Sequence, residues 1–219
     1  MKLSQEEREV VQTAYSTLEK RIYWDLKDLI LESVNSVGDL AGDLGKAVPQ
    51  ILIKDHGYKL HINLQASLKN AFIHLFRNSL DHGIEAADER IKKNKKENGS
   101  IFIEMEMGDS FLTLKYHDDG RGINLAKLRQ LGTEKGLLPP ECPDLQEICR
   151  LIFSDGISTK DDVSEISGLG VGMSAVKAHL EENGCQIRTI LLTNDNSSGF
   201  LPFEFHLLFP KKLVRRFQD

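Results

Sequence analysis

The chain has 219 residues, of which 40% are hydrophobic and 28% are charged, and its formal net charge is −5. These values are ordinary for a soluble globular protein, and the negative charge argues against a general nucleic-acid binder. No apolar run approaches the roughly 18 residues that a membrane-spanning helix needs. The first residues lack the apolar core of a signal peptide, and the three cysteines show no metal-ligand spacing. We therefore expect a cytoplasmic protein with reduced thiols.

The first segment, residues 5–46, is predicted to be helical. Its first half carries apolar residues in a heptad pattern, namely Val11, Tyr15, Leu18 and Ile22. The phase of the pattern slips near Asp25. Two interpretations stay open: a helix pair that packs on its own domain, or a linker or dimerisation helix. We assign residues 1–36 to an N-terminal helical extension.

A hairpin is expected between this extension and the next helix. Pro49 ends the helical pattern, residues 51–53 form a short apolar run, and residues 55–57 have turn composition. Residues 59–64 alternate between polar and apolar side chains, which predicts the return strand.

The central helix is predicted over residues 70–83, with Gly83 at its C-terminal end. Its apolar residues form a broad surface that can be buried in a core. The polar residues share another stripe, which comprises His74, Asn78, Asp81, His82 and Glu85. Burying such a stripe unpaired costs free energy, so it is expected to line a cavity that holds water, a metal or a polar ligand. Glu85 follows Gly83 and is expected to lie off the helix, outside the site.

Beyond this helix, residues 85–98 are highly charged and predict a solvated helix and loop, with a basic docking patch as the alternative.

Alternating residues over 101–107 and 112–116 predict a hairpin that leads into Asp118. Helices are expected at residues 125–131, 145–153 and 173–182, with Asp144 as a cap, and strands at 186–192 and 203–209. Residues 211–219 are basic and are expected to be a solvated tail or a cut linker.

Three short segments have the residue types of a nucleotide site. Gly168, Gly170 and Gly172 precede a helix, where backbone N–H groups favour an anion; a flexible loop is the alternative. A Rossmann interpretation fails because no strand leads directly into these glycines. Asp118, Gly120 and Gly122 follow a strand, so a carboxylate there can bind the amino group of a base, unless the segment is an ordinary acidic turn.

His74 and Asn78 lie one helical turn apart. An amide oxygen is a suitable ligand for Mg²⁺, which takes the rest of its shell from water and phosphates. The alternative is a pair satisfied by hydrogen bonds in the core. Zinc bound by His74 and His82 is disfavoured, because the two residues lie two turns apart and no third ligand is evident.

In this order and spacing, the segments resemble the ATP-binding catalytic domain of histidine kinases, within the group that includes gyrase, Hsp90 and MutL. The chemotaxis kinases of the CheA type are the most similar. Residues 74–85 resemble their N box, 118–123 the first glycine box, 153–160 the F box and lid, and 167–173 the second glycine box. The resemblance extends from about residue 40 to residue 210.

The resemblance implies a role for each matching residue. Asp118 would bind the adenine amino group, with Gly120, Gly122 and Ile123 beside it, and Asn78 would ligate Mg²⁺. Asp81 and His82 would face the nucleotide. The lid and the phosphate-binding positions would be Lys127, Ser158, Thr159, Lys160, Gly168, Gly170, Val171, Gly172 and Met173.

His74 distinguishes two activities within the group. The related ATPases usually have Glu at this position, where it activates water as a general base. Histidine in its place resembles the CheA-type kinases and favours transfer of the ATP γ-phosphate to a histidine. The sequence departs from these kinases at Leu169, where Arg is usual, and at Ser174, where Asp is common. Leu169 removes a cation from the lid, which bears on lid closure or on a contact to a partner.

We therefore predict an α/β (α+β) two-layer sandwich of a mixed sheet and helices, the Bergerat ATP-binding fold. Residues 37–210 would form a catalytic domain that uses ATP and Mg²⁺ in two-component signalling. No histidine of the chain has a phosphoacceptor context, so the partners would be a separate phosphoacceptor histidine domain and a response regulator, and a homodimer through the N-terminal helix is possible. The alternatives are an ATP-sensing module without transfer activity, or an ATPase or anti-sigma-type serine kinase.

Overall fold

The computed structural model describes residues 4–139, 141, 144–157, 172–193, 195 and 199–217. Its helices are α1 (Gln5–Ile22), α2 (Leu26–Asp43), α3 (Gln65–Asn78), α4 (Ala87–Lys92), α5 (Leu125–Glu134), α6 (Leu145–Arg150) and α7 (Met173–Glu182), with short 3₁₀ or π turns η1 (Ile62–Leu64), η2 (Ser79–Gly83), η3 (Leu151–Phe153) and η4 (Lys211–Leu213). Its strands are β1 (Tyr23–Asp25), β2 (Gln50–Lys54), β3 (Tyr58–His61), β4 (Ser100–Met107), β5 (Phe111–Asp118), β6 (Gln186–Leu191), β7 (Phe203–Pro210) and β8 (Val214–Arg216).

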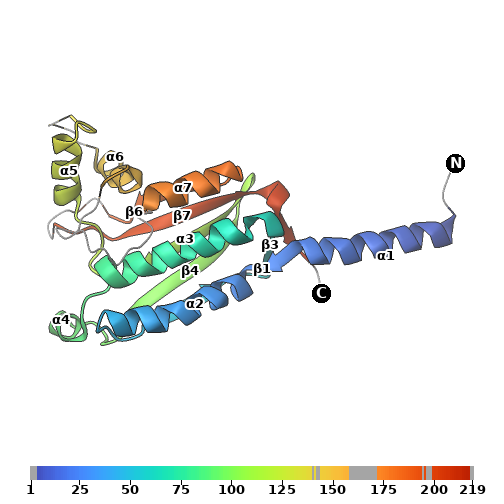
Figure 1. The fold of residues 1–219 in the computed structure, drawn as a ribbon, viewed down its shortest axis with the longest axis horizontal. Helices are drawn as coiled ribbons and strands as arrows, with labels where there is room; N and C mark the ends of the chain where they lie inside the picture. Colours follow the sequence, from blue (N-terminus) through green and yellow to red (C-terminus); the bar gives the residue numbers. More distant parts are fainter. Residues whose placement is uncertain are drawn as a thin grey trace.

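A five-stranded mixed sheet in the order β2-β4-β5-β7-β6 forms one layer of the fold. β2 runs parallel to β4, and the other neighbours are antiparallel. Side chains along β4 and β5 alternate between buried and half-exposed, so one face of the sheet is covered. α2, α3 and α7 lie across the sheet as the second layer (Figure 1). This arrangement confirms the predicted two-layer α/β fold.

The main core lies between these layers. It joins α2, α3, the sheet and α7 through side chains that include Ile30, Phe72, Phe76 and Tyr116. A smaller cluster lies under α5 and α6 and is built from Ile123, Leu125, Leu128, Leu138, Ile148, Cys149, Leu151 and Leu201. α2 thus belongs to the main core, although residues up to 36 were assigned to an extension. The division of the chain at residues 36 and 210 stays a prediction.

The predicted hairpin at residues 51–64 is wrong. β2 pairs with β4, in a register that places Gln50 opposite Ser100, and β3 pairs with β1 and β8. A parallel pair can be joined only by a long crossover, which here contains α3 and α4. The short turn at Asp55 therefore connects two strands that belong to different sheets.

β1, which follows α1, and β8, the last strand of the described chain, lie on either side of β3 in the second sheet, β1-β3-β8. The predicted helical segment is interrupted there, because Tyr23–Asp25 form β1. Residues 211–216 are not a solvated tail: Val214 in β8 is buried, and Arg215 binds Glu19 of α1 at 3.1 Å. α1 itself extends away from the body of the protein (Figure 1) and buries none of its residues. None of the helices in the described part of the chain is apolar and long enough to cross a membrane.

Candidate functional site

The central helix ends in a π-helical turn. α3 leads into Ser79–Gly83, and the N–H of Ile84 closes the turn by donating to the Ser79 carbonyl oxygen at 2.7 Å. Phe72 and Phe76 point into the core, whereas His74 and Asn78 are half-exposed on α3. The wider turn ends the regular α-helical period after Asn78. Such π turns often occur at functional sites.

The carboxyl group of Asp118 lies at the end of β5, against this turn. Its Oδ2 accepts a hydrogen bond of 2.6 Å from the Ser79 hydroxyl, and its Oδ1 accepts one of 3.0 Å from the Gly120 N–H. The Ser79 hydroxyl also lies 2.9 Å from the hydroxyl of Tyr116. Burial raises the pKa of the Asp118 carboxyl group, while the bonds from Ser79 and Gly120 oppose that rise. The result is a fixed carboxylate that can still accept a hydrogen bond from a ligand.

Three glycines make this arrangement possible. A Cβ atom on Gly83 would lie 2.7 Å from both carboxyl oxygens of Asp118, and one on Gly120 would lie 2.2 Å from the Gly83 carbonyl oxygen. The Arg121 N–H donates to the same carbonyl at 2.9 Å. Gly122 has a positive φ of 82°, and a Cβ there would lie 2.3 Å from the Leu201 carbonyl oxygen. Backbones therefore approach each other at distances that only glycine permits.

A hollow lies beside Asp118. It is lined by Tyr116, His117, Asp118, Gly120, Gly122, Pro202, Phe203 and Phe205. Its wall combines a fixed carboxylate, bare backbone and aromatic rings. These groups fit a flat heterocycle that carries an amino group, because the carboxylate can accept from the amino group while the ring lies on the apolar wall.

Lys46 supports the π turn from the loop after α2. Its ammonium group donates to the carbonyl oxygens of Leu80 and of Ile84, the latter at 2.7 Å. Burial, reinforced by the charge of Arg121, lowers the pKa of this lysine. Lys46 and Ser79 carry no signal in the sequence, because neither residue differs in pattern from an ordinary loop lysine or helix serine.

The surroundings of His74 favour its neutral form. Burial lowers its pKa, and the charges of Arg77 and His179 lower it further. Its imidazole lies on α3, which packs against α7. A neutral imidazole can both accept and donate a hydrogen bond, whereas the carboxylate that the related ATPases have at this position can only accept.

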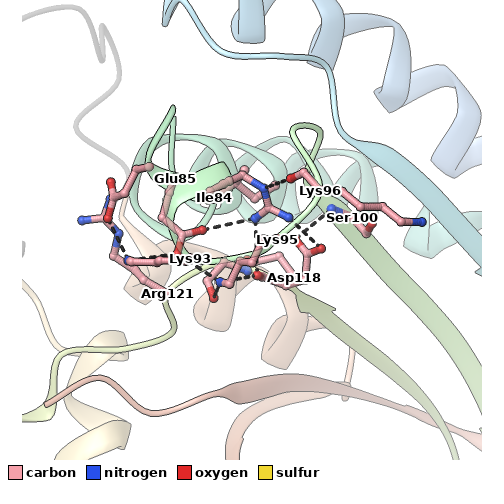
Figure 2. Close-up of polar contacts among 12 residues, drawn as sticks. Ile84, Glu85, Lys93, Lys95, Lys96, Ser100, Asp118 and Arg121 are labelled. Carbon is pink, nitrogen blue, oxygen red and sulfur yellow. Dashed lines mark hydrogen bonds and ion pairs between the residues drawn. The ribbon is translucent and has the colours of Figure 1, made fainter. Parts of the chain in front are cut away.

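A buried ionic network fastens the segment after the π turn to the end of β5 (Figure 2). Arg90 is 0% exposed and binds Glu85 at 3.2 Å and Asp119 at 2.9 Å. Lys93 and Lys95 also bind Glu85, at 3.3 and 3.0 Å. Burial would raise the pKa of Glu85, but hydrogen bonds from backbone and from Lys95 and Lys93 lower it to about 2.

Most of residues 85–98 are exposed, as expected of a solvated helix and loop, but Glu85 and Arg90 are buried in this network. The charged residues of α4 are divided between solvent and interior, and a buried charge requires paired partners of the kind seen here. Glu85 lies off the helix, as expected, and does not reach the hollow. It belongs to the scaffold that holds the site together.

Several predicted site residues lie outside the described part of the chain, namely Ser158, Thr159, Lys160, Gly168, Gly170 and Val171. Of the others, Gly172 is the N-cap of α7 and Met173 is buried. Lys127 lies in the first turn of α5, where its N–H donates to the Asn124 side chain at 3.0 Å. The described residues contain no cluster of His, Cys, Asp and Glu that would hold a metal without help from a ligand. The roles of all these residues stay predictions.

Comparisons with known proteins agree with this geometry. Residues 63–211 match the family model described as histidine kinase-, DNA gyrase B- and HSP90-like ATPase. The chain is 36% identical to the gliding motility regulatory protein of Myxococcus xanthus, over 84% of this chain and 24% of that protein. It is 35% identical to the chemotaxis protein CheA of Klebsiella aerogenes, over 68% of this chain and 22% of that protein. The chain thus spans less than a quarter of the length of these relatives.

Solved structures show the same fold. The mycobacterial sensor histidine kinase MprB aligns with a TM-score of 0.53 at 15% identity, covering 86% of this chain and 97% of that one. The catalytic domain of the histidine kinase ThkA aligns with a TM-score of 0.50 at 20% identity, covering 86% and 94%.

Proposed function

The chain belongs to the histidine kinase-, DNA gyrase B- and HSP90-like ATPase family, and from this we propose that it is the ATP-binding catalytic part of a CheA-like histidine kinase. It would transfer the γ-phosphate of ATP to a histidine on another domain or chain. The observation that carries the proposal is the Asp118 carboxylate, which Ser79 and Gly120 fix beside the hollow.

In this proposal the hollow holds adenine. Asp118 accepts from the amino group of the base, and the glycine backbone at Gly120 and Gly122 lies against the ring. Asn78, half-exposed at the end of α3, provides an amide oxygen for Mg²⁺. The metal ion would supply charge neutralisation at the phosphates. Asp81, His82 and Lys127 would contact the nucleotide.

His74 supports phosphoryl transfer over hydrolysis. Hydrolysis needs a base that activates water, a role for which the related ATPases use Glu at the position of His74. Transfer to a histidine does not demand such a base. A neutral acceptor histidine already has a lone pair. Its nitrogen can form the N–P bond while the P–O bond to ADP breaks, so catalysis rests on positioning.

We further propose that α1 pairs with a second copy of the chain. The heptad residues Val11, Tyr15, Leu18 and Ile22 are 40–61% exposed along one helix, none of whose residues is buried within the described part of the chain. A phosphoacceptor histidine domain and a response regulator would be the other partners. The free thiols of Cys149 and Cys185 support action in the cytoplasm.

ATP binding is the first test. Isothermal titration calorimetry of the chain should give a nucleotide affinity that Asp118→Asn lowers by more than roughly tenfold, since the amide replaces one acceptor with a donor. Asp109→Asn, in the exposed turn between β4 and β5, is the matched control and should bind like the unmodified protein. Equal affinities for the two variants would mean that adenine does not bind in the hollow.

Transfer is the second test. The chain is incubated with γ-labelled ATP and an isolated phosphotransfer domain, and the label is examined for the acid lability of phosphohistidine. His74→Glu should release more inorganic phosphate, because a carboxylate can act as the missing base. Binding without labelling of any acceptor would instead favour an ATP-sensing module, and rapid phosphate release by the unmodified chain would favour an ATPase.

A further inference from the structure

We propose that Lys95 is a positioning residue for nucleotide binding, because its ammonium group fixes the backbone of Asp118–Gly120. The inference rests on the proposed function, since it concerns how Asp118 is presented to a base. Lys95 lies outside the resembling motifs and touches neither the hollow nor the carboxyl group of Asp118.

The ammonium group of Lys95 has three acceptors. It donates to the carbonyl oxygen of Asp119 at 2.8 Å, to that of Gly120 at 2.8 Å, and to Oε1 of Glu85 at 3.0 Å (Figure 2). An ammonium group has three N–H donors, so these contacts use all of them. Lys95 therefore ties two consecutive backbone carbonyls to the segment that follows the π turn.

These carbonyls belong to the loop that orients Asp118. The Gly120 N–H donates to Oδ1 of Asp118 at 3.0 Å, so a shift of this loop moves a donor that sets the carboxylate orientation. β5 ends at Asp118, and from there the chain leaves the ladder of the sheet. Backbone and side chains both hold the loop: the Asp119 N–H donates to the Ser100 carbonyl oxygen at 3.0 Å, and the Asp119 carboxylate accepts from the Ser100 N–H at 2.9 Å and from Arg90 at 2.9 Å.

Lys93 provides a natural comparison. It binds the same oxygen of Glu85 at 3.3 Å, and it binds Glu89 at 2.8 Å, so it resembles Lys95 in its ion pairs. Its ammonium group does not reach Asp119 or Gly120. The side chains of Lys93 and Lys95 are 46% and 30% exposed, so each can be shortened or neutralised without opening the core. The two lysines therefore differ in that only Lys95 binds the backbone of the loop at Asp119 and Gly120.

Substitution of Arg90 would not test the positioning of the loop separately from folding. It is fully buried, and its removal would leave the buried Glu85 carboxylate without its arginine partner. Breaking one side of a buried ion pair destabilises the whole domain. An effect of Arg90→Met on binding would therefore not separate positioning from folding, whereas Lys95 allows that separation.

The experiment compares Lys95→Met with Lys93→Met in the full chain. ATP and ADP affinities are measured by calorimetry, with and without Mg²⁺, at a temperature where circular dichroism shows both variants to be folded. Lys95→Met should weaken every one of these affinities by roughly tenfold, the scale of a hydrogen bond to a charged group, and by the same factor with and without Mg²⁺. Lys93→Met should stay within about twofold, and Lys95→Arg should restore part of the loss.

A second measurement uses no nucleotide. In ¹H–¹⁵N spectra of the free protein, the Gly120 amide signal should shift in Lys95→Met and not in Lys93→Met, because only the first change releases the loop. Should Lys95→Met not fold, Lys95→Gln is measured in its place.

Unchanged affinity in Lys95→Met, equal losses in both variants, or an unmoved Gly120 signal would each overturn the inference. Failure of the unmodified chain to bind ATP would overturn the proposed function instead, and the Gly120 signal would still decide the role of Lys95.

Discussion

The Ser79 hydroxyl lies 2.6 Å from Oδ2 of Asp118 and joins the π turn of the central helix to the end of β5. The two residues are 39 positions apart in the sequence. Ser79 also lies within hydrogen-bonding distance of the Tyr116 hydroxyl, so a short chain of polar groups crosses the interior. The position of the carboxylate is thus set by the helix as much as by its own strand.

Removing this hydroxyl should weaken nucleotide binding. In Ser79→Ala, Asp118 loses a donor that opposes the effect of burial, so its pKa rises further and its orientation is less restricted. We expect ATP affinity to fall by roughly tenfold in calorimetry. The control is Ser67→Ala, on the same helix, whose hydroxyl binds only Asn183. If both alanine variants bind ATP equally, Ser79 does not orient the carboxylate.

Binding should depend on pH through Asp118. The ionised carboxyl group is the stronger acceptor for the adenine amino group, and burial raises its pKa above 3.8. ATP affinity should therefore fall on acidification at a higher pH than an ordinary aspartate would give. Titrations between about pH 7 and about pH 4.5 would reveal this. An affinity that is flat over this range would contradict the assignment.

The raised pKa of Asp118 affects the stability of the folded protein in the opposite direction: acidification favours folding while it weakens ATP binding. Because the folded-state pKa of Asp118 is raised, protonation of this group favours the folded protein, and the contribution is lost as pH rises through the folded-state pKa. Asp118→Asn, which mimics the neutral form, should raise the unfolding midpoint near neutral pH in urea while it removes binding. A variant that loses both stability and binding would indicate a structural role instead.

Gly83 should tolerate no side chain. In Gly83→Ala the new Cβ would lie 2.7 Å from the Asp118 carboxyl oxygens, which Ser79 and Gly120 hold in place. We expect lower stability, by about 1–3 kcal/mol, and a loss of ATP affinity. Gly42→Ala is the control, because a Cβ at that helical position meets no atom within 4 Å and should stabilise α2 slightly. Denaturant unfolding and calorimetry on both variants provide the comparison.

Asn78→Ala should weaken ATP binding more in the presence of Mg²⁺ than in its absence, because an amide oxygen would be lost from the metal shell. Asn70→Ala, an exposed position on the same helix, is the control. Calorimetry in Mg²⁺ and in EDTA measures the two affinities. A loss of equal size under both conditions would mean that Asn78 does not ligate the metal.

Sequence periodicity correctly predicted the elements whose contacts lie close together in the sequence. The hairpin of β4 and β5, the helix that Asp144 caps, and the end of the central helix at Gly83 follow from side-chain alternation, capping chemistry and a helix stop. Pairing between distant strands was not predictable in this way. β2 has a partner 50 residues away, at Ser100, and nothing in its composition distinguishes that partner from β3.

The site was predictable only in part. Asp118 and its glycines were selected because a carboxylate with bare backbone beside it has a clear chemical use. Ser79, Lys46 and Lys95 were missed, because their importance comes from what they touch across the fold. Arg90 was assigned to solvent because its neighbours in sequence are charged, yet the fold places it in the interior with two carboxylates.

The two hydrophobic clusters imply that one part of the domain can unfold separately from the rest. The cluster under α5 and α6 contains eight buried residues, and it meets the main core at partly buried side chains such as Ile152 and Phe203. It can therefore open by local unfolding while α3, β4 and β5 stay intact. Amide protons of α5 and α6 should exchange with solvent well before those of the central strands. The region around Lys127 would then rearrange on its own timescale, independently of the carboxylate that selects the base.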